Sequence, residues 1–194
     1  MSVTDALILN TAVLDLRSRE FGFVDALVGA GGLAKCATQD MPRLEDETVF
    51  ALDRAGGATA GGCGNVAPLL ARAGLRVTVG AMIGRGPYGG LDATGRVFAD
   101  QLGAAGVDLS ALVTHPTLPT GTTFIHEVPA GERGGIAYFP NANDEFDFGL
   151  FREHVARLRP TVVHYMYSGL SARGDANGGQ DLARAGVVHR HHRH

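Results

Sequence analysis

The chain contains 194 residues, of which 45% are hydrophobic, and it carries a formal net charge of −3. A chain of this length can bury a stable core without disulfides or bound metals. Its two cysteines, Cys36 and Cys63, are too few for a disulfide framework. The mildly acidic balance argues against nucleic acid and anionic membranes as partners. No apolar run approaches the ~20 residues of a membrane span, and no basic region precedes the first apolar run as in a signal peptide. We therefore expect a cytoplasmic globular protein.

Apolar runs and glycine turns follow one another at the start of the chain. Residues 6–10 are an apolar run that predicts a buried strand, ending near Asp15. Residues 21–28 lead into Gly-Ala-Gly-Gly at 29–32, which predicts a turn or flap. Residues 33–53 have a mixed pattern that assigns no element. This segment therefore predicts one strand and a flap.

The next segment has clear helical and strand patterns. From Asn65 the apolar residues follow a helical spacing, and Gly74 is typical of a helix C-cap. Residues 75–83 are rich in Val, Ile and Met and predict a buried strand, and residues 91–105 predict a second helix that ends at Gly106. The inner faces of the two helices are expected to consist of Val66, Leu69, Leu70 and Ala73, and of Phe98 and Leu102.

The sequence pattern changes in the second half of the chain, from helical spacing of apolar residues to strand-forming residues. Residues 122–128 contain β-branched and aromatic strand formers, residues 129–135 predict a turn, and residues 136–139 predict the returning strand. We expect this hairpin to stand off the main sheet. Residues 146–158 then predict a helix, and residues 161–167 predict a further strand.

The order of these elements predicts the fold class. Alternating strands and helices favour an α/β fold with a mostly parallel sheet and helices on both of its faces. The chain ends in the low-complexity run His-Arg-His-His-Arg-His, and we expect residues 186–194 to form a disordered tail. The histidines lack metal-ligand spacing, so no metal site is predicted. We therefore expect one α/β domain over residues 1–185, with a hairpin lid at about 107–140.

The most informative segment is residues 61–67 (GGCGNVA), followed by Gly74 and Gly84. Glycines remove side-chain bulk, and a helix N-terminus offers unpaired N–H donors, so such a segment lets a polar ligand approach the backbone. Its Gly-x-Gly-x-x-Ala part also fits a loose dinucleotide fingerprint, which requires an acidic residue about 20 positions later. Residues 81–84 (AMIG) supply none there. A purely structural tight turn is the other alternative.

This glycine pattern resembles the N-terminal signature of the ribokinase-like (PfkB-type) carbohydrate kinases. In that signature a Gly-Gly pair is followed by Asn, a small residue and two more spaced glycines, and Cys63 is the one departure here. The resemblance reaches about Gly179 and corresponds to the N-terminal portion of the family. Further matching segments are Gly106-Val107-Asp108, Thr120-Gly121, Gly131-Glu132-Arg133 and Pro140-Asn141-Ala142-Asn143.

The resemblance implies a three-layer ribokinase-like α/β fold with a small β-hairpin lid over the substrate. It implies transfer of the γ-phosphoryl of ATP, with Mg²⁺, to a hydroxyl of a sugar or nucleoside. The residues that would bind this acceptor are Asp15, Gly61, Gly62 and Asn65, together with Phe124 on the lid.

The family's catalytic signature is not matched. That signature is a Gly-Ala-Gly-Asp stretch, which supplies an anion hole and a base. The nearest pair here, Gly174-Asp175, follows the bulky Arg173. We therefore assign no catalytic residue and expect a truncated kinase that is inactive alone, with a tail typical of a shifted reading frame. The alternative is a non-catalytic ligand-binding or self-associating protein, and a homodimer through the lid or an exposed sheet edge is the expected protein partner.

Overall fold

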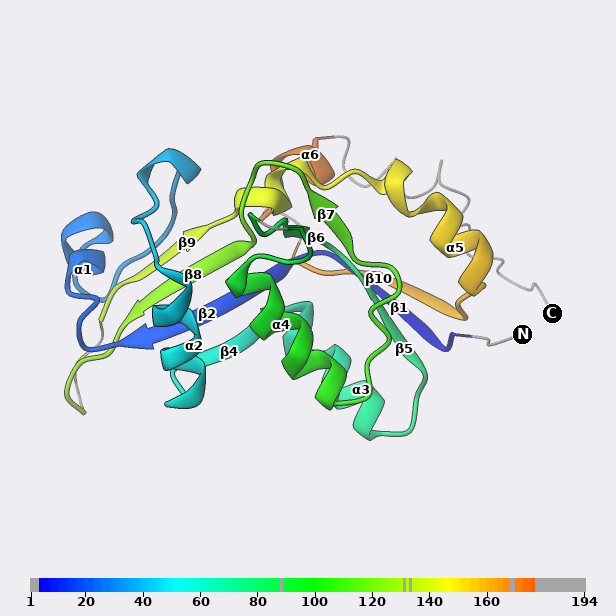
Figure 1. The fold of residues 1–194 in the computed structure, drawn as a ribbon, viewed down its shortest axis with the longest axis horizontal. Coiled ribbons are helices and arrows are strands. Elements are labelled where there is room, and N and C mark those ends of the chain that lie inside the picture. The colour runs from blue at the N-terminus through cyan, green and yellow to red at the C-terminus, as the bar shows by residue number, and fades with distance from the viewer. Residues whose placement is uncertain (1–3, 88, 131, 133, 168–169, 177–194) are drawn as a thin grey trace.

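The computed structural model describes residues 4–87, 89–130, 132, 134–167 and 170–176 (Figure 1). The expected tail at 186–194 lies outside these residues, as do Gly131 and Arg133 of the expected turn. Mixed α/β structure fills the described part of the chain, as the alternating sequence pattern predicts.

A parallel three-stranded sheet, in the order β10-β1-β5, forms the core sheet (Figure 1). Every residue of β1 is buried, as expected for a parallel strand that is covered on both faces. After β5 the chain continues into β6, which pairs in parallel with β7. The bounds of these strands are β1 (Ala6–Leu9), β5 (Val77–Gly80), β6 (Met82–Gly84), β7 (Val113–His115) and β10 (Val162–Tyr165).

Successive residues of β1 face two different cores, because side chains alternate across a strand. Ile8 belongs to a hydrophobic cluster that contains Phe98 of α4. Leu7 belongs to a second cluster that contains Phe151, next to α5. Helices therefore cover both faces of the core sheet and give the molecule three layers (Figure 1). These helices are α3 (Ala67–Arg72), α4 (Ala93–Ala104) and α5 (Arg152–Leu158).

A second sheet of five strands, in the order β3-β9-β8-β2-β4, is called the lid sheet below. Strands β8 and β9 form the expected antiparallel hairpin, with Thr122 opposite Phe139. Besides the hairpin, the lid sheet contains β2, β3 and β4, and β2 lies between β8 and β4. The expected lid at 107–140 is therefore wrong in one part: β7, which falls in that range, pairs with β6 and not with the lid sheet. The bounds are β2 (Ala12–Ser18), β3 (Leu33–Lys35), β4 (Ala58–Gly62), β8 (Gly121–His126) and β9 (Ile136–Phe139).

One face of the lid sheet is covered by helices. α1 packs on β8 and β9, whereas α2 and α4 pack on β2 and β4. Phe124 of β8 is 1% exposed on this covered face, where its ring meets Phe21 and Phe139 edge to face. The helices and the short 3₁₀ helix between them are α1 (Phe23–Val28), η1 (Thr38–Asp40) and α2 (Asp46–Arg54).

Several elements are shorter than the sequence pattern predicts. The strand expected at 75–83 is interrupted at Ala81, between β5 and β6. The helix expected from Asn65 begins at Ala67, and Leu69 of its expected inner face is exposed. Apolar spacing persists through 3₁₀ turns, so the pattern does not separate them from α-helix. Besides η1, the described 3₁₀ helices are η2 (Cys63–Asn65), η3 (Asn141–Glu145) and η4 (Phe148–Phe151), and η4 occupies the start of the helix expected at 146–158. The last described helix is α6 (Ala172–Asp175).

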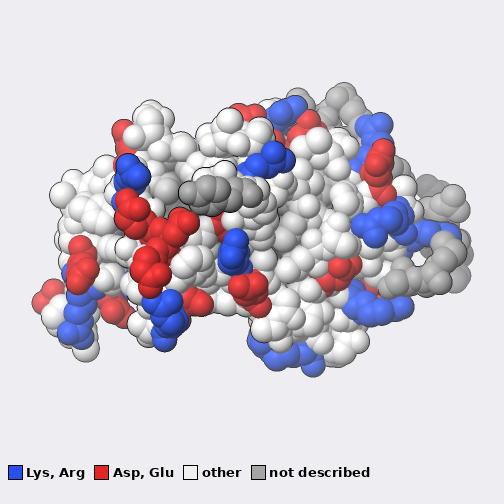
Figure 2. Space-filling view, in the orientation of Figure 1, with Lys and Arg blue, Asp and Glu red and all other residues white. Residues whose placement is uncertain are grey.

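The described surface carries charges of both signs. On the face drawn in Figure 2, basic side chains are separated by acidic and uncharged ones. None of the described helices has the length and apolar character that crossing a membrane requires.

Candidate functional site

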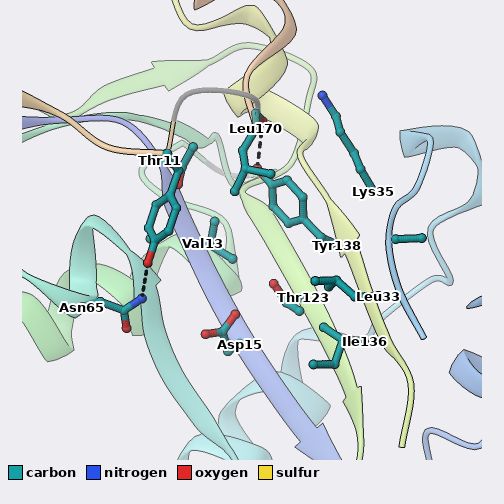
Figure 3. A pocket seen from close by; sticks show the side chains of 13 residues that line it. Thr11, Val13, Asp15, Leu33, Lys35, Asn65, Thr123, Ile136, Tyr138 and Leu170 are labelled. Atoms are coloured by element: carbon teal, nitrogen blue, oxygen red, sulfur yellow. Dashed lines mark hydrogen bonds between the residues drawn. The ribbon is translucent and has the colours of Figure 1, made fainter. Parts of the chain in front are cut away.

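A cavity of about 290 Å³ lies against the open face of the lid sheet (Figure 3). Its size is close to the lower end of the roughly 300–1,000 Å³ that is usual for small-molecule sites. Strands β2, β3, β8 and β9, the β4–η2 junction and the segment after β10 all contribute to it. The lining residues are Thr11, Val13, Asp15, Leu33, Ala34, Lys35, Gly62, Asn65, Thr123, Ile136, Tyr138, Tyr167 and Leu170.

Asp15 lies in the middle of β2, and its carboxylate points into the cavity (Figure 3). The parallel register places Thr123 of β8 beside it. Burial raises the pKa of the Asp15 carboxyl, while a hydrogen bond with the Thr123 side chain and the charge of Arg17 act in the opposite direction. The sequence pattern predicts that Asp15 lies just beyond the first strand. In the structure Asp15 lies within β2, which follows β1 after two residues.

Two adjacent glycines, Gly61 and Gly62, end β4 beside Asp15. A Cβ atom at Gly61 would collide with the Asp15 carboxylate, so this glycine leaves the space that the carboxylate occupies. Gly62 has φ +59°, and a Cβ atom there would collide with the carbonyl oxygen of Thr11. Gly62 lines the cavity itself, whereas Gly61 acts on it through Asp15.

Asn65 reaches the same cavity from η2. Its side-chain Nδ2 donates a hydrogen bond of 3.1 Å to the Oη of Tyr167, a residue after β10 (Figure 3). Asp15 and Asn65, which the sequence analysis selected separately, therefore converge on one cavity, as expected of two groups that bind the same ligand.

Phe124 does not reach the cavity, whereas Asp15, Gly62 and Asn65 line it and Gly61 acts on it through Asp15. Its side chain is buried among the rings on the covered face of the lid sheet, and the neighbouring Thr123 lines the cavity instead. Successive residues of a strand point to opposite faces, so a shift of one position exchanges a ligand-facing residue for a core residue.

Several lining residues were missed by the sequence analysis. Leu33 and Lys35 come from β3, a three-residue strand in the stretch that received no assignment. Ile136 and Tyr138 belong to the expected returning strand of the hairpin, where alternation by two would have placed them on one face. Burial raises the pKa of Tyr138, which carries its hydroxyl at the upper end of the cavity.

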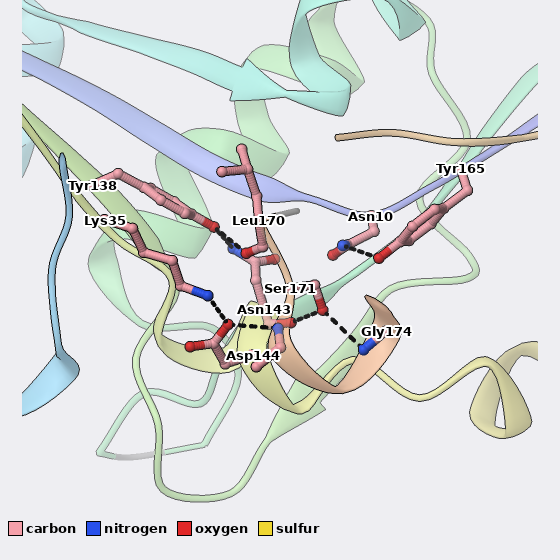
Figure 4. Close-up of polar contacts among 10 residues, drawn as sticks. Asn10, Lys35, Tyr138, Asn143, Asp144, Tyr165, Leu170, Ser171 and Gly174 are labelled. Atoms are coloured by element: carbon pink, nitrogen blue, oxygen red, sulfur yellow. Dashed lines mark hydrogen bonds and ion pairs between the residues drawn. The ribbon is translucent and has the colours of Figure 1, made fainter. Parts of the chain in front are cut away.

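Polar contacts hold Leu170 and Ser171, which follow β10 in the chain, beside the cavity (Figure 4). The Oη of Tyr138 donates a hydrogen bond of 3.3 Å to the carbonyl oxygen of Leu170. The hydroxyl of Ser171 donates to the backbone carbonyl of Asn143. Asp144 accepts hydrogen bonds from Lys35 at 2.7 Å and from the backbone N–H of Ala172 at 2.8 Å. These contacts join β3, η3 and the start of α6 around one rim of the cavity.

The remaining chemically reactive side chains lie outside the cavity. Cys63 is fully buried, and burial raises the pKa of its thiol to about 12, so it packs as a small core residue. The Nδ1 atom of His126 lies 2.7 Å from Asp25, on the side of α1. His164 is exposed on β10. Among the described residues no group of three His, Cys, Asp or Glu side chains is arranged to hold a metal ion. The side chain of Asp175 lies outside the described part.

Solved kinase structures share this fold. A probable sugar kinase protein from Rhizobium etli CFN 42 superposes with a TM-score of 0.59 at 20% identity, over 95% of this chain and 53% of that chain. Adenosine kinase from Sinorhizobium meliloti gives 0.55 at 17% identity, over 84% and 47%. Fructokinase from Halothermothrix orenii gives 0.55 at 16% identity, over 94% and 54%. At these identities the likeness concerns the fold.

The similarity to known proteins covers only part of the solved kinase structures. The chain spans about half the length of these solved structures. No curated protein sequence matches it significantly. A family model described as "pfkB family carbohydrate kinase" matches residues 37–177, which include β4, the glycine segment and the hairpin. Together with the three-layer fold and its lid sheet, this match shows that the chain belongs to the pfkB family of carbohydrate kinases.

Proposed function

We propose that residues 1–194 form the acceptor-binding part of a kinase that transfers the γ-phosphoryl group of ATP to a hydroxyl of a sugar or nucleoside. The observation that carries this proposal is the convergence of Asp15 and Asn65 on one cavity beneath the lid sheet. A carboxylate accepts hydrogen bonds and an amide both donates and accepts them, so the pair suits the hydroxyl groups of a polyol.

Each proposed site residue has a separate part in this binding. Asp15 and Asn65 hold the hydroxyls, and Thr123 positions the Asp15 carboxylate from the adjacent strand. Gly61 provides the space for that carboxylate, and Gly62 exposes the backbone at the cavity wall. Phe124 supports the lid sheet from its opposite face.

The residues that line this cavity do not fit the phosphoryl donor that the family implies. Lys35 is the cationic residue that lines the cavity, and its ammonium group is already paired with Asp144 at 2.7 Å. No described cluster of acidic or histidine side chains suits Mg²⁺. We therefore assign acceptor binding to these residues and derive no step of phosphoryl transfer from them.

Acceptor binding is tested by calorimetric titration of the 194-residue polypeptide with ribose, fructose and adenosine. We expect at least one of them to bind, and Asp15→Asn and Asn65→Ala to weaken that binding about tenfold or more, since a hydrogen bond to a charged group contributes about 1.5–3 kcal/mol. Asp100→Asn, on the exposed face of α4, is the matched control and should leave binding unchanged. Absence of binding by all three compounds would overturn the proposal.

Activity is tested by detecting ADP release with the same acceptors. Positioning and charge stabilisation supply nearly all of the catalysis in phosphoryl transfer, so we expect this polypeptide alone to show no acceptor-dependent turnover. Turnover that disappears in Asp15→Asn would instead place the catalytic machinery within these 194 residues. Turnover that survives the substitution would identify a contaminating kinase.

A further inference from the structure

The cavity has two chemically different sides (Figure 3). On one side, Asp15 and Asn65 present a carboxylate and an amide. On the other side, Leu33 of β3 and Ile136 of β9 are direct register partners, so their side chains form one continuous apolar surface. We call this surface, with Ala34, Tyr138 and Leu170, the apolar wall.

The side-chain polar atoms of Tyr138 and Lys35, which lie at the apolar wall, are already engaged. The Tyr138 hydroxyl donates to the Leu170 carbonyl at 3.3 Å. The Lys35 ammonium is 2.7 Å from Asp144, so Lys35 contributes its aliphatic stem to the cavity. A hydroxyl placed against Leu33 or Ile136 would therefore lose its water without gaining a partner, which is unfavourable.

The mouth of the cavity carries large apolar side chains that are exposed to solvent. Leu33 is 68% exposed and Tyr167 is 42% exposed, and they reach the cavity from β3 and from the segment after β10. A ligand with a flat apolar portion would remove part of this surface from water, which is favourable in proportion to the area covered. A compact polyol has no such portion.

We propose, on the basis of the acceptor function proposed above, that the acceptor is a nucleoside rather than a free monosaccharide. Its ribosyl hydroxyls bind at Asp15 and Asn65, and its planar base packs on the apolar wall at Leu33 and Ile136. The two ends of a nucleoside thus match the two sides of the cavity. A free monosaccharide carries hydroxyls on nearly every carbon and matches one side only.

The test compares adenosine, uridine and ribose by calorimetric titration of the 194-residue polypeptide. We expect both nucleosides to bind at least tenfold more tightly than ribose. Leu33→Asn should weaken adenosine binding about tenfold and change ribose binding less than twofold. Leu69→Asn replaces another exposed leucine, outside the cavity on α3, and should change neither. Ile136→Thr, which keeps a β-branched residue in β9, is a second variant with the same expected selectivity.

The outcomes separate this inference from the function on which it rests. If ribose binds as tightly as the nucleosides, and Asp15→Asn weakens the binding of ribose, the nucleoside assignment is overturned and acceptor binding stays in place. Equal loss of adenosine and ribose binding in both wall variants would also overturn it, since the wall would then not distinguish the base. Failure of all three compounds to bind would overturn the acceptor function itself.

Discussion

Gly61 lies directly against the carboxylate of Asp15, on the neighbouring strand of the lid sheet. The antiparallel register pairs Gly61 with Val13 and Asp15 with Thr59, so the carboxylate extends diagonally over the glycine. A Cβ atom at position 61 would occupy the place of the Asp15 carboxylate oxygens. Position 61 therefore controls the orientation of the group to which we assign acceptor binding.

Gly61→Ala is expected to abolish acceptor binding while leaving the fold intact. The new methyl group meets the end of a flexible side chain, which can rotate away, and Gly61 has no positive φ. The change in the free energy of unfolding should stay below about 1 kcal/mol. Chemical unfolding and calorimetric titration check the two halves of this prediction; retained binding would show that Asp15 does not need its present orientation.

Gly62→Ala is the matched comparison, because the same added methyl group, one residue later, is expected to lower the stability of the fold itself. Gly62 has φ +59° and ψ −125°, and its added Cβ would meet the Thr11 backbone rather than a movable side chain. We expect a stability loss of about 2 kcal/mol or more. Equal stability of the two variants in chemical unfolding would contradict this contrast.

Asp15→Asn is expected to stabilise the protein at neutral pH while it weakens acceptor binding. Burial raises the pKa of the Asp15 carboxyl above 3.8, so the native state binds its proton more tightly than the unfolded state does. The contribution of Asp15 to stability is thus fully present below 3.8 and is lost as the pH rises through the native pKa. The advantage of Asp15→Asn in the free energy of unfolding should be largest at pH 7 and shrink on acidification.

Asp5→Asn supplies a control of opposite sign. Hydrogen bonds from Arg76 lower the pKa of Asp5 to about 2, so its stabilising effect is present above 3.8 and is lost as the pH falls toward 2. Asp5→Asn should therefore destabilise at pH 7, and less so at pH 2. Parallel pH profiles for Asp5→Asn and Asp15→Asn, measured by thermal unfolding, would contradict the assignment of the two environments.

Asp92→Ala is expected to cost about 2–4 kcal/mol of stability, since a helix cap and charged hydrogen bonds are lost together. Asp92 caps α4 by accepting from the Gly95 N–H at 2.7 Å, and it accepts from the Thr120 N–H at 2.8 Å and hydroxyl at 2.6 Å. Asp100→Ala, on the exposed face of α4, should cost less than about 0.5 kcal/mol. Chemical unfolding measures both, and similar costs would disprove a structural role for Asp92.

Asn143→Leu is expected to cost about 2–4 kcal/mol, because two buried backbone groups lose their partners. The Asn143 side chain accepts from the Ala12 N–H at 3.0 Å and donates to the Ala12 carbonyl at 2.8 Å, which fixes η3 to the start of β2. Chemical unfolding checks the loss. Asn143→Asp is the companion variant: it places a carboxylate oxygen against the Ala12 carbonyl at a fully buried position, so it should cost at least as much as Asn143→Leu at neutral pH.

The sequence by itself determined the elements whose pattern is local. The helix expected at 91–105 is observed as α4, with Phe98 and Leu102 fully buried, and Gly74 takes the positive φ that follows α3. The hairpin is present as β8 and β9. A period of 3.6 or 2 and a glycine after a helix are consequences of backbone geometry, so neighbouring residues suffice to reveal them.

The tertiary structure alone decided which residues share the cavity. Thr123 faces it and Phe124 does not, because the register of β8 beside β2 fixes the face on which each side chain lies. Leu33 and Tyr167 reach it from segments far apart in the sequence. A strand pattern shows that two faces exist, but which face meets helices and which meets a ligand depends on packing between distant segments.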